Sequence, residues 1–167
     1  TACFNDGRED DSFKEYKIND FIEWKKNTFK IIEEELISST LETHILSSEH
    51  FSSRLTTQKE ISRLFDFLKV IYSDIEVLVY FRRQDEYAVS LYSTNLKSGG
   101  VGKNIIPSGM LPDRYNYYSI CNKWGKVFGR KNIIAKQFDR KILKNGSVLS
   151  DFCNVVGINE DKTKAVE

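Results

Sequence analysis

The sequence lacks an excess of charge of either sign. Its 25 Lys and Arg residues nearly balance its 24 Asp and Glu residues, which gives a formal net charge of +1. Proteins that bind nucleic acid usually carry a clear basic excess, so this balance argues against that class. It leaves room for a local basic cluster that holds a single phosphate group.

Cysteines and long apolar runs are also scarce. The chain has an odd number of cysteines, which lie far apart and form no Cys-x-x-Cys pair; they are Cys3, Cys121 and Cys153. A zinc site or a redox dithiol is therefore disfavoured, and we expect no bound metal. Reduced thiols are typical of a cytoplasmic protein. We expect no transmembrane segment, because no apolar run approaches the ~20 residues that span a bilayer. We also expect no signal peptide, because the first residues do not have the pattern of one.

The 167 residues fit one domain. A chain of this length can bury a single substantial core. Residues 1–18 are predicted to be a polar lead-in and residues 159–167 a polar tail, and no internal repeat is found. The first residue is Thr1 rather than Met, which suggests processing or a longer parent chain.

Hydrophobic periodicity predicts helices alternating with strands. Spacings of three and four predict helices that begin near residues 19, 57, 85, 117 and 148. Thr57 and Glu60 form a capping box at the start of the second helix. Short apolar runs predict strands over residues 43–48, 75–81 and 132–138.

This order is typical of an α/β fold in which a parallel sheet is flanked by helices. Ligands of such sheets bind outside the carboxyl ends of the strands. The residues that follow Leu46, Phe81 and Phe138 are therefore the positions where we expect chemistry.

Two arginines follow the second predicted strand. Arg82 and Arg83 stand at its carboxyl end, and Ser90 lies eight residues after Arg82 on the next helix. Arginine suits phosphate because its planar fork donates two parallel hydrogen bonds to phosphate oxygens. The helix N-terminus near Gln84 would add a favourable dipole and free amides. The pattern favours a phosphate site, and a structural ion pair or helix cap is the alternative.

This stretch resembles the 3′-phosphate-binding motif of PAPS-dependent sulfotransferases, with an apolar strand, an arginine, and a serine eight residues later before an aromatic. Arg82, Ser90 and Tyr92 fall on that motif. Arg83-Gln84 stands where the family often has Asp-Pro or Asn-Pro, and this variant resembles bacterial proteins of cell-surface polysaccharide biosynthesis. Residues 45–51 are similar to the family's strand that ends in Ser-Ser-Glu, and residues 118–158 to its later helix–strand–helix block.

The resemblance implies a P-loop NTPase-like sulfotransferase core that transfers a sulfuryl group from the donor PAPS to a hydroxyl, with a carbohydrate as the favoured acceptor. It implies that Arg82 and Ser90 hold the 3′-phosphate. Arg83 is either a second contact or a solvated charge. Glu49 is favoured over His50 as the base that takes the acceptor's proton. Glu49 could instead stabilise only the first turn of the helix that follows it.

One part of the family pattern is missing. The family begins with a strand and a loop that cradles the 5′-phosphosulfate, and nothing before Phe21 matches it. The run from Gly99 to Asn104 is not a substitute, because Asn104 stands where Ser or Thr should be, Lys97 stands where the first glycine should be, and the run follows a helix. We interpret it as a mobile surface loop.

Two alternatives to a complete enzyme remain open. The first is a non-catalytic or truncated sulfotransferase-like domain that acts as a binding module. The second, a nucleotide-dependent kinase, rests on fold analogy alone. Trp24, Trp124 and the tyrosines around Tyr117 could stack on a sugar or be ordinary core or surface aromatics. Lys103, Arg114 and Lys123 could form an acceptor-side basic patch or a solvated face.

Overall fold

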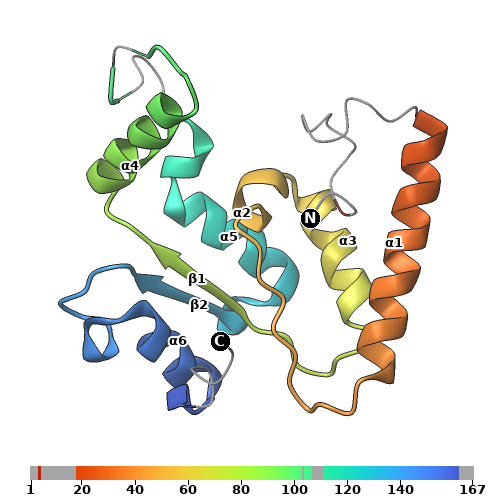
Figure 1. Cartoon of the computed structure of the whole chain (residues 1–167). Helices are drawn as coiled ribbons and strands as arrows, with labels where there is room; N and C mark the ends of the chain where they lie inside the picture. The colour runs from red at the N-terminus through yellow and green to blue at the C-terminus, as the bar shows by residue number, and fades with distance from the viewer. Residues whose placement is uncertain (1–3, 5–17, 103, 107–110, 162–167) are drawn as a thin grey trace. The chain divides into compact units, whose positions relative to one another are not determined.

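The computed structural model describes residue 4 and residues 18–102, 104–106 and 111–161, without the side chains of residues 18–21 (Figure 1). Most of the predicted polar lead-in, Cys3, Lys103 and the last six residues of the predicted tail lie outside this part. The chain groups into two compact units. The first comprises residues 1–77 and 118–133, and the second comprises residues 78–117 and 134–167.

The first unit is helical. It contains α1 (Ile18–Ser38), α2 (Phe51–Arg54), α3 (Gln58–Leu68) and all but the first residue of α5 (Tyr117–Phe128) (Figure 1). The predicted helices that begin near residues 19, 57 and 117 are therefore confirmed. Their apolar faces meet in one core, as the 3.6-residue period requires. The buried members of this core are Phe4, Leu55, Ile61, Leu64, Leu68, Trp124 and Phe128.

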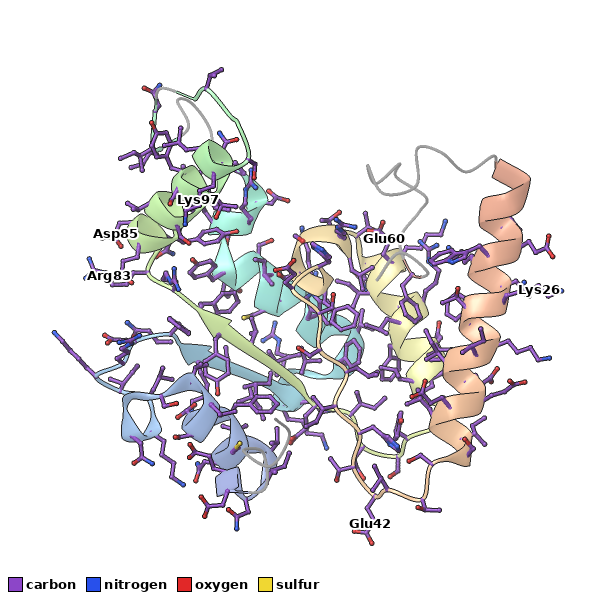
Figure 2. The ribbon with its side chains drawn as sticks, viewed as in Figure 1. Lys26, Glu42, Glu60, Arg83, Asp85 and Lys97 are labelled. Atoms are coloured by element: carbon purple, nitrogen blue, oxygen red, sulfur yellow. The ribbon has the colours of Figure 1, made fainter. Side chains whose placement is uncertain are left out.

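The predicted capping box at the start of α3 is confirmed. The Thr57 hydroxyl accepts a hydrogen bond from the Glu60 amide at 3.3 Å. The Glu60 carboxylate accepts hydrogen bonds from the amides of Thr56 and Thr57 at 3.0 and 2.9 Å. Glu60, labelled in Figure 2, is fully buried. Its charge is tolerated there because it satisfies the amides that the first helical turn leaves unpaired.

The predicted strand over residues 43–48 is wrong. This stretch forms no strand, and Ile45 and Leu46 are 46% and 43% exposed. Its C-terminal end makes local bonds, because the Ser48 hydroxyl accepts from the His50 amide and the Ser48 carbonyl accepts from the Phe51 amide. Serine bonds of this kind compete with ladder pairing. Two apolar residues between polar pairs bury too little surface to outweigh them.

The second unit holds most of a two-stranded parallel sheet. Strand β1 (Val77–Phe81) pairs with β2 (Ile133–Gln137), and the first residue of each strand belongs to the first unit. The predicted strands over 75–81 and 132–138 are thus confirmed in slightly shorter form, and the α/β class holds. Helices α4 (Gln84–Lys97) and α6 (Val148–Val156) also match their predicted positions.

Short helical turns connect the longer elements. These are η2 (Asp113–Tyr115) and η4 (Lys144–Gly146) in the second unit and η3 (Arg130–Asn132) in the first. Helix α6 ends at Gly157, whose φ of +74° is the left-handed conformation that glycine adopts without a steric penalty. Across the described part of the chain, no helix combines the length and apolar character that crossing a bilayer demands.

We expect Thr57→Ala to lower the free energy of unfolding by about 1 kcal/mol, because the Glu60 amide loses its cap. Urea unfolding followed by circular dichroism measures the loss. Thr94→Ala is the control, because that exposed hydroxyl donates to the Ser90 carbonyl of its own helix and does not cap a helix end. Equal stability of Thr57→Ala and the wild type would show that the capping box does not stabilise α3.

Candidate phosphate site at the end of strand β1

The carboxyl ends of the two strands are joined by one backbone hydrogen bond. The Phe138 amide donates to the Phe81 carbonyl at 2.7 Å, one residue beyond the end of β2. Arg82 follows directly, at the edge of a parallel sheet where ligands bind. The sequence placed Arg82 at this strand end, and the structure confirms that position.

The Arg82 side chain is half-buried and rests on an aromatic ring. Its guanidinium carbon lies 4.9 Å from the centroid of the Phe138 ring. In the described part of the chain, no carboxylate forms an ion pair with this guanidinium. A cation that packs on an aromatic face keeps its in-plane N–H groups available for an anion. Arg82 can therefore donate to a phosphate without first breaking an ion pair.

The neighbouring Arg83 is in a different situation. It is exposed, and its guanidinium lies 2.8 Å from the Asp85 carboxylate (Figure 2). The pKa of Asp85 is lowered first by a hydrogen bond from the Glu86 amide and further by the charge of Arg83. The Asp85 carboxylate thus already accepts a hydrogen bond from an amide in the first turn of α4, where the sequence suggested free amides for a phosphate. Arg83 is paired with a carboxylate, whereas Arg82 forms no ion pair with any of the described residues.

Ser90 lies on α4, in the same unit as Arg82. It is half-buried, and among the described residues its hydroxyl has no recorded hydrogen-bond partner. It stands about 9 Å along the helix axis from Gln84, at 1.5 Å of rise per residue. The structure therefore leaves one guanidinium and one hydroxyl available on two consecutive elements of one unit.

Glu49 and His50 lie in the first unit, at the turn before α2. The Glu49 carboxylate is 3.4 Å from His50 Nε2, and the two side chains are 86% and 42% exposed. His50 occupies the N-cap position of α2 without a side-chain capping bond, and the Ser48 hydroxyl accepts a hydrogen bond from the His50 amide at 3.2 Å. The structure brings the two acid–base candidates together, on an open surface.

Several aromatic residues that could have been a sugar platform belong to the interior. Tyr115 is buried and packs edge-on against Tyr87, with ring centroids 5.2 Å apart. Trp124 is buried in the core of the first unit, and Trp24 packs against that core. Tyr118 differs, because its side chain is 78% exposed. Arg114 is exposed as well.

Sequence reasoning missed a buried charged network on the sheet. Asp151 of α6 is 3% exposed, and its carboxylate accepts hydrogen bonds from the Tyr80 hydroxyl at 2.8 Å and from the Lys144 amide at 3.1 Å. Lys136 of β2 forms an ion pair with it at 2.5 Å. A lysine and a tyrosine among apolar strand residues were the available signal. The network links both strands to α6.

The pKa values of the two acidic groups in this network, Asp151 and Tyr80, are shifted in opposite directions. The hydrogen bond from Lys136 is the main cause that lowers the pKa of Asp151. Burial, aided by the neighbouring Asp151 carboxylate, raises the pKa of Tyr80 to about 12. Asp151 is therefore ionised and Tyr80 protonated at neutral pH, which is the state that satisfies all three groups.

We expect Asp151→Asn to lower the free energy of unfolding by about 3 kcal/mol, because removing one partner leaves Lys136 without its counter-charge. Urea unfolding measures this loss. Asp66→Asn is the matched control, since Asp66 pairs with Lys69 on the surface, where such a pair contributes about 1 kcal/mol or less. Similar losses in the two variants would contradict a special role for the network.

The same network predicts a pH dependence. A carboxyl whose folded pKa is lowered stabilises the fold above its unfolded pKa of about 3.9, and this contribution disappears as the pH falls further. The wild type should therefore lose stability on acidification below about pH 4 more steeply than Asp151→Asn. Urea midpoints measured across this range test the expectation, and parallel curves would contradict it.

Comparisons with known proteins add one relative. No family model matches this chain. No solved structure matches it either. A protein of Archaeoglobus fulgidus, described only as an uncharacterized protein, is 31% identical over 115 residues. These residues are 69% of this chain and 30% of that protein, so the match covers less than a third of the relative's length.

Proposed function

We propose that this chain is a sulfotransferase-like domain whose second unit binds the 3′-phosphate of PAPS, and that it serves sulfuryl transfer to a hydroxyl, with a carbohydrate as the favoured acceptor. One observation carries the proposal. The Arg82 guanidinium stands at the carboxyl end of β1, supported by the Phe138 ring and without a carboxylate partner among the described residues.

Three properties of Arg82 favour a phosphate over other ligands. Its charge is uncompensated by a neighbouring acid in the described structure, so an anion gains the full attraction. Its half-buried position weakens competition from water, which strengthens charge-assisted hydrogen bonds. Its planar fork matches two oxygens of one phosphate. A single carboxylate ligand would satisfy the fork as well, but would leave the Ser90 hydroxyl unused.

Ser90 is the second contact that we propose for this phosphate. A hydroxyl donates one hydrogen bond and can rotate to suit an oxygen that the arginine fork does not reach. Ser90 and Arg82 come from α4 and the end of β1, which are consecutive along the chain and belong to one unit. Their spacing of eight residues is the same as that of the arginine and the serine in the sulfotransferase motif that this stretch resembles.

The reaction that we propose is an in-line displacement at sulfur. The acceptor oxygen forms a new bond to sulfur while the bond from sulfur to the 5′-phosphate oxygen of PAPS breaks. The bonding electron pair leaves with PAP, and the acceptor's hydroxyl proton passes to a base. The resemblance assigns that base to Glu49, with His50 as the alternative. Both residues belong to the first unit.

A binding module without catalysis is the second candidate. The side chain of Glu49 is 86% exposed, and its recorded partner is a histidine that is itself 42% exposed. Catalytic bases are usually desolvated or held by neighbours that adjust their pKa. The open setting of Glu49 is the observation that favours a domain that binds its ligand without transferring sulfur.

We expect the wild type to bind PAP and Arg82→Ala to bind it at least about tenfold more weakly, because hydrogen bonds to a charged group are lost. Isothermal calorimetry on the full chain measures both affinities. Lys126→Ala is the control, since it removes one exposed positive charge from α5. No binding at millimolar PAP, or equal binding by Arg82→Ala, would contradict the phosphate site.

Transfer itself is tested with radiolabelled PAPS and dextran as a hydroxyl acceptor. If Glu49 is the base, Glu49→Gln should bind PAP like the wild type and transfer sulfur about 100-fold more slowly. His50→Gln distinguishes the alternative base in the same assay. A wild type that binds PAP and releases none from PAPS in the presence of dextran would favour the binding module.

A further inference from the structure

We infer that Tyr117 is a positioning residue that holds Arg82 ready for the 3′-phosphate, an inference that rests on the proposed function. The Tyr117 hydroxyl donates a hydrogen bond of 2.7 Å to the carbonyl oxygen of Arg82. Tyr117 is the first residue of α5 and lies 35 residues further along the chain. Both residues belong to the second unit.

The Arg82 carbonyl needs such a donor. The last recorded bond between the strands runs from the Phe138 amide to the Phe81 carbonyl, so Arg82 is the first residue beyond the ladder. In the part of the chain that the structure describes, the Tyr117 hydroxyl is the recorded donor to this carbonyl. Backbone carbonyls shielded from water are normally paired, and the Tyr117 hydroxyl pairs this one, which ties the backbone just beyond β1 to the start of α5.

The ring of Tyr117 fixes where its hydroxyl lies. It stacks on Phe81, with ring centroids 4.2 Å apart and planes 17° from parallel. Burial raises the pKa of Tyr117, and the nearby charge of Arg82 only partly opposes this. The phenol therefore stays protonated at neutral pH and remains a donor.

Tyr117 is also anchored by its own neighbours in the chain. Tyr115, in the turn η2 just before α5, is buried and packs edge-on against Tyr87 of α4. These contacts hold the segment that leads into Tyr117, and the stack on Phe81 holds the Tyr117 ring itself. We therefore assign to Tyr117 the role of restraining the Arg82 backbone through this hydrogen bond.

Arg82 is held at two points as a result. Tyr117 fixes its carbonyl, and the Phe138 ring supports its guanidinium at 4.9 Å. A long side chain that is ordered before the ligand arrives loses less conformational entropy on binding. Without the Tyr117 hydroxyl, the arginine must be ordered by the phosphate itself. The affinity that depends on the 3′-phosphate should fall, and affinity for the rest of the nucleotide should not.

The test compares PAP with AMP, which lacks the 3′-phosphate, by calorimetry on the wild type and on Tyr117→Phe. The variant keeps the ring that stacks on Phe81 and removes only the hydroxyl. We expect its affinity for PAP to fall about three- to tenfold, the effect of one hydrogen bond, with affinity for AMP unchanged. Tyr118→Phe is the control, because it removes a hydroxyl from the adjacent, exposed tyrosine.

The outcomes separate this inference from the proposed function. If the wild type shows no preference for PAP over AMP, the phosphate site fails and the role of Tyr117 fails with it. If the wild type prefers PAP and Tyr117→Phe keeps the same ratio of affinities, only the role of Tyr117 is overturned. Equal losses for both ligands, or a lowered thermal midpoint that accounts for the loss, would show a structural effect and overturn it as well.

Discussion

The backbone hydrogen bond from Phe138 to Phe81 is the contact on which the candidate site depends. It joins the ends of two parallel strands that are more than fifty residues apart in the chain. This pairing brings the Phe138 ring beneath the guanidinium of Arg82, which follows Phe81 directly. If the strands slipped by one residue, every side chain would change faces, and this arrangement would be lost.

A second contact maintains the same pairing from another position on the sheet. Asp151 of α6 binds Tyr80 of β1 and Lys136 of β2, so one buried carboxylate spans both strands. A buried charge that loses its partners destabilises the fold by more free energy than the intact pair contributes. The network therefore favours the strand register in which Tyr80 and Lys136 both reach Asp151. The position of Arg82 follows from this register. The stability of the sheet and the geometry of the candidate site are therefore linked in the second unit.

The parts of the fold that depend on neighbouring residues could be predicted from the sequence. Apolar spacing revealed the helices, and the capping box at Thr57 and Glu60 needs only residues three positions apart. The strand predicted over residues 43–48 is wrong because β-propensity does not show whether a strand has a partner to pair with. Local hydrogen bonds of Ser48 form there instead of a ladder. Arg82 and Ser90 could be proposed from their spacing alone.

The supports of Arg82 could not be predicted in this way. Tyr117 and Phe138 reach it from 35 and 56 positions away, and only the strand pairing and the turn before α5 bring them there. The partner of Tyr80 lies 71 positions away in α6 for the same reason. Local sequence patterns carry no information about such contacts. The sequence therefore predicted Arg82 as a site residue but not the residues that support it, Tyr117 and Phe138.

A crystal structure of the full chain with PAP tests the central claim most directly. The account predicts that the 3′-phosphate lies about 2.7–2.9 Å from the Arg82 guanidinium, with Ser90 Oγ as a second donor and the Tyr117 bond to the Arg82 carbonyl kept. PAP bound elsewhere, or bound with its 3′-phosphate directed away from Arg82, would contradict the account.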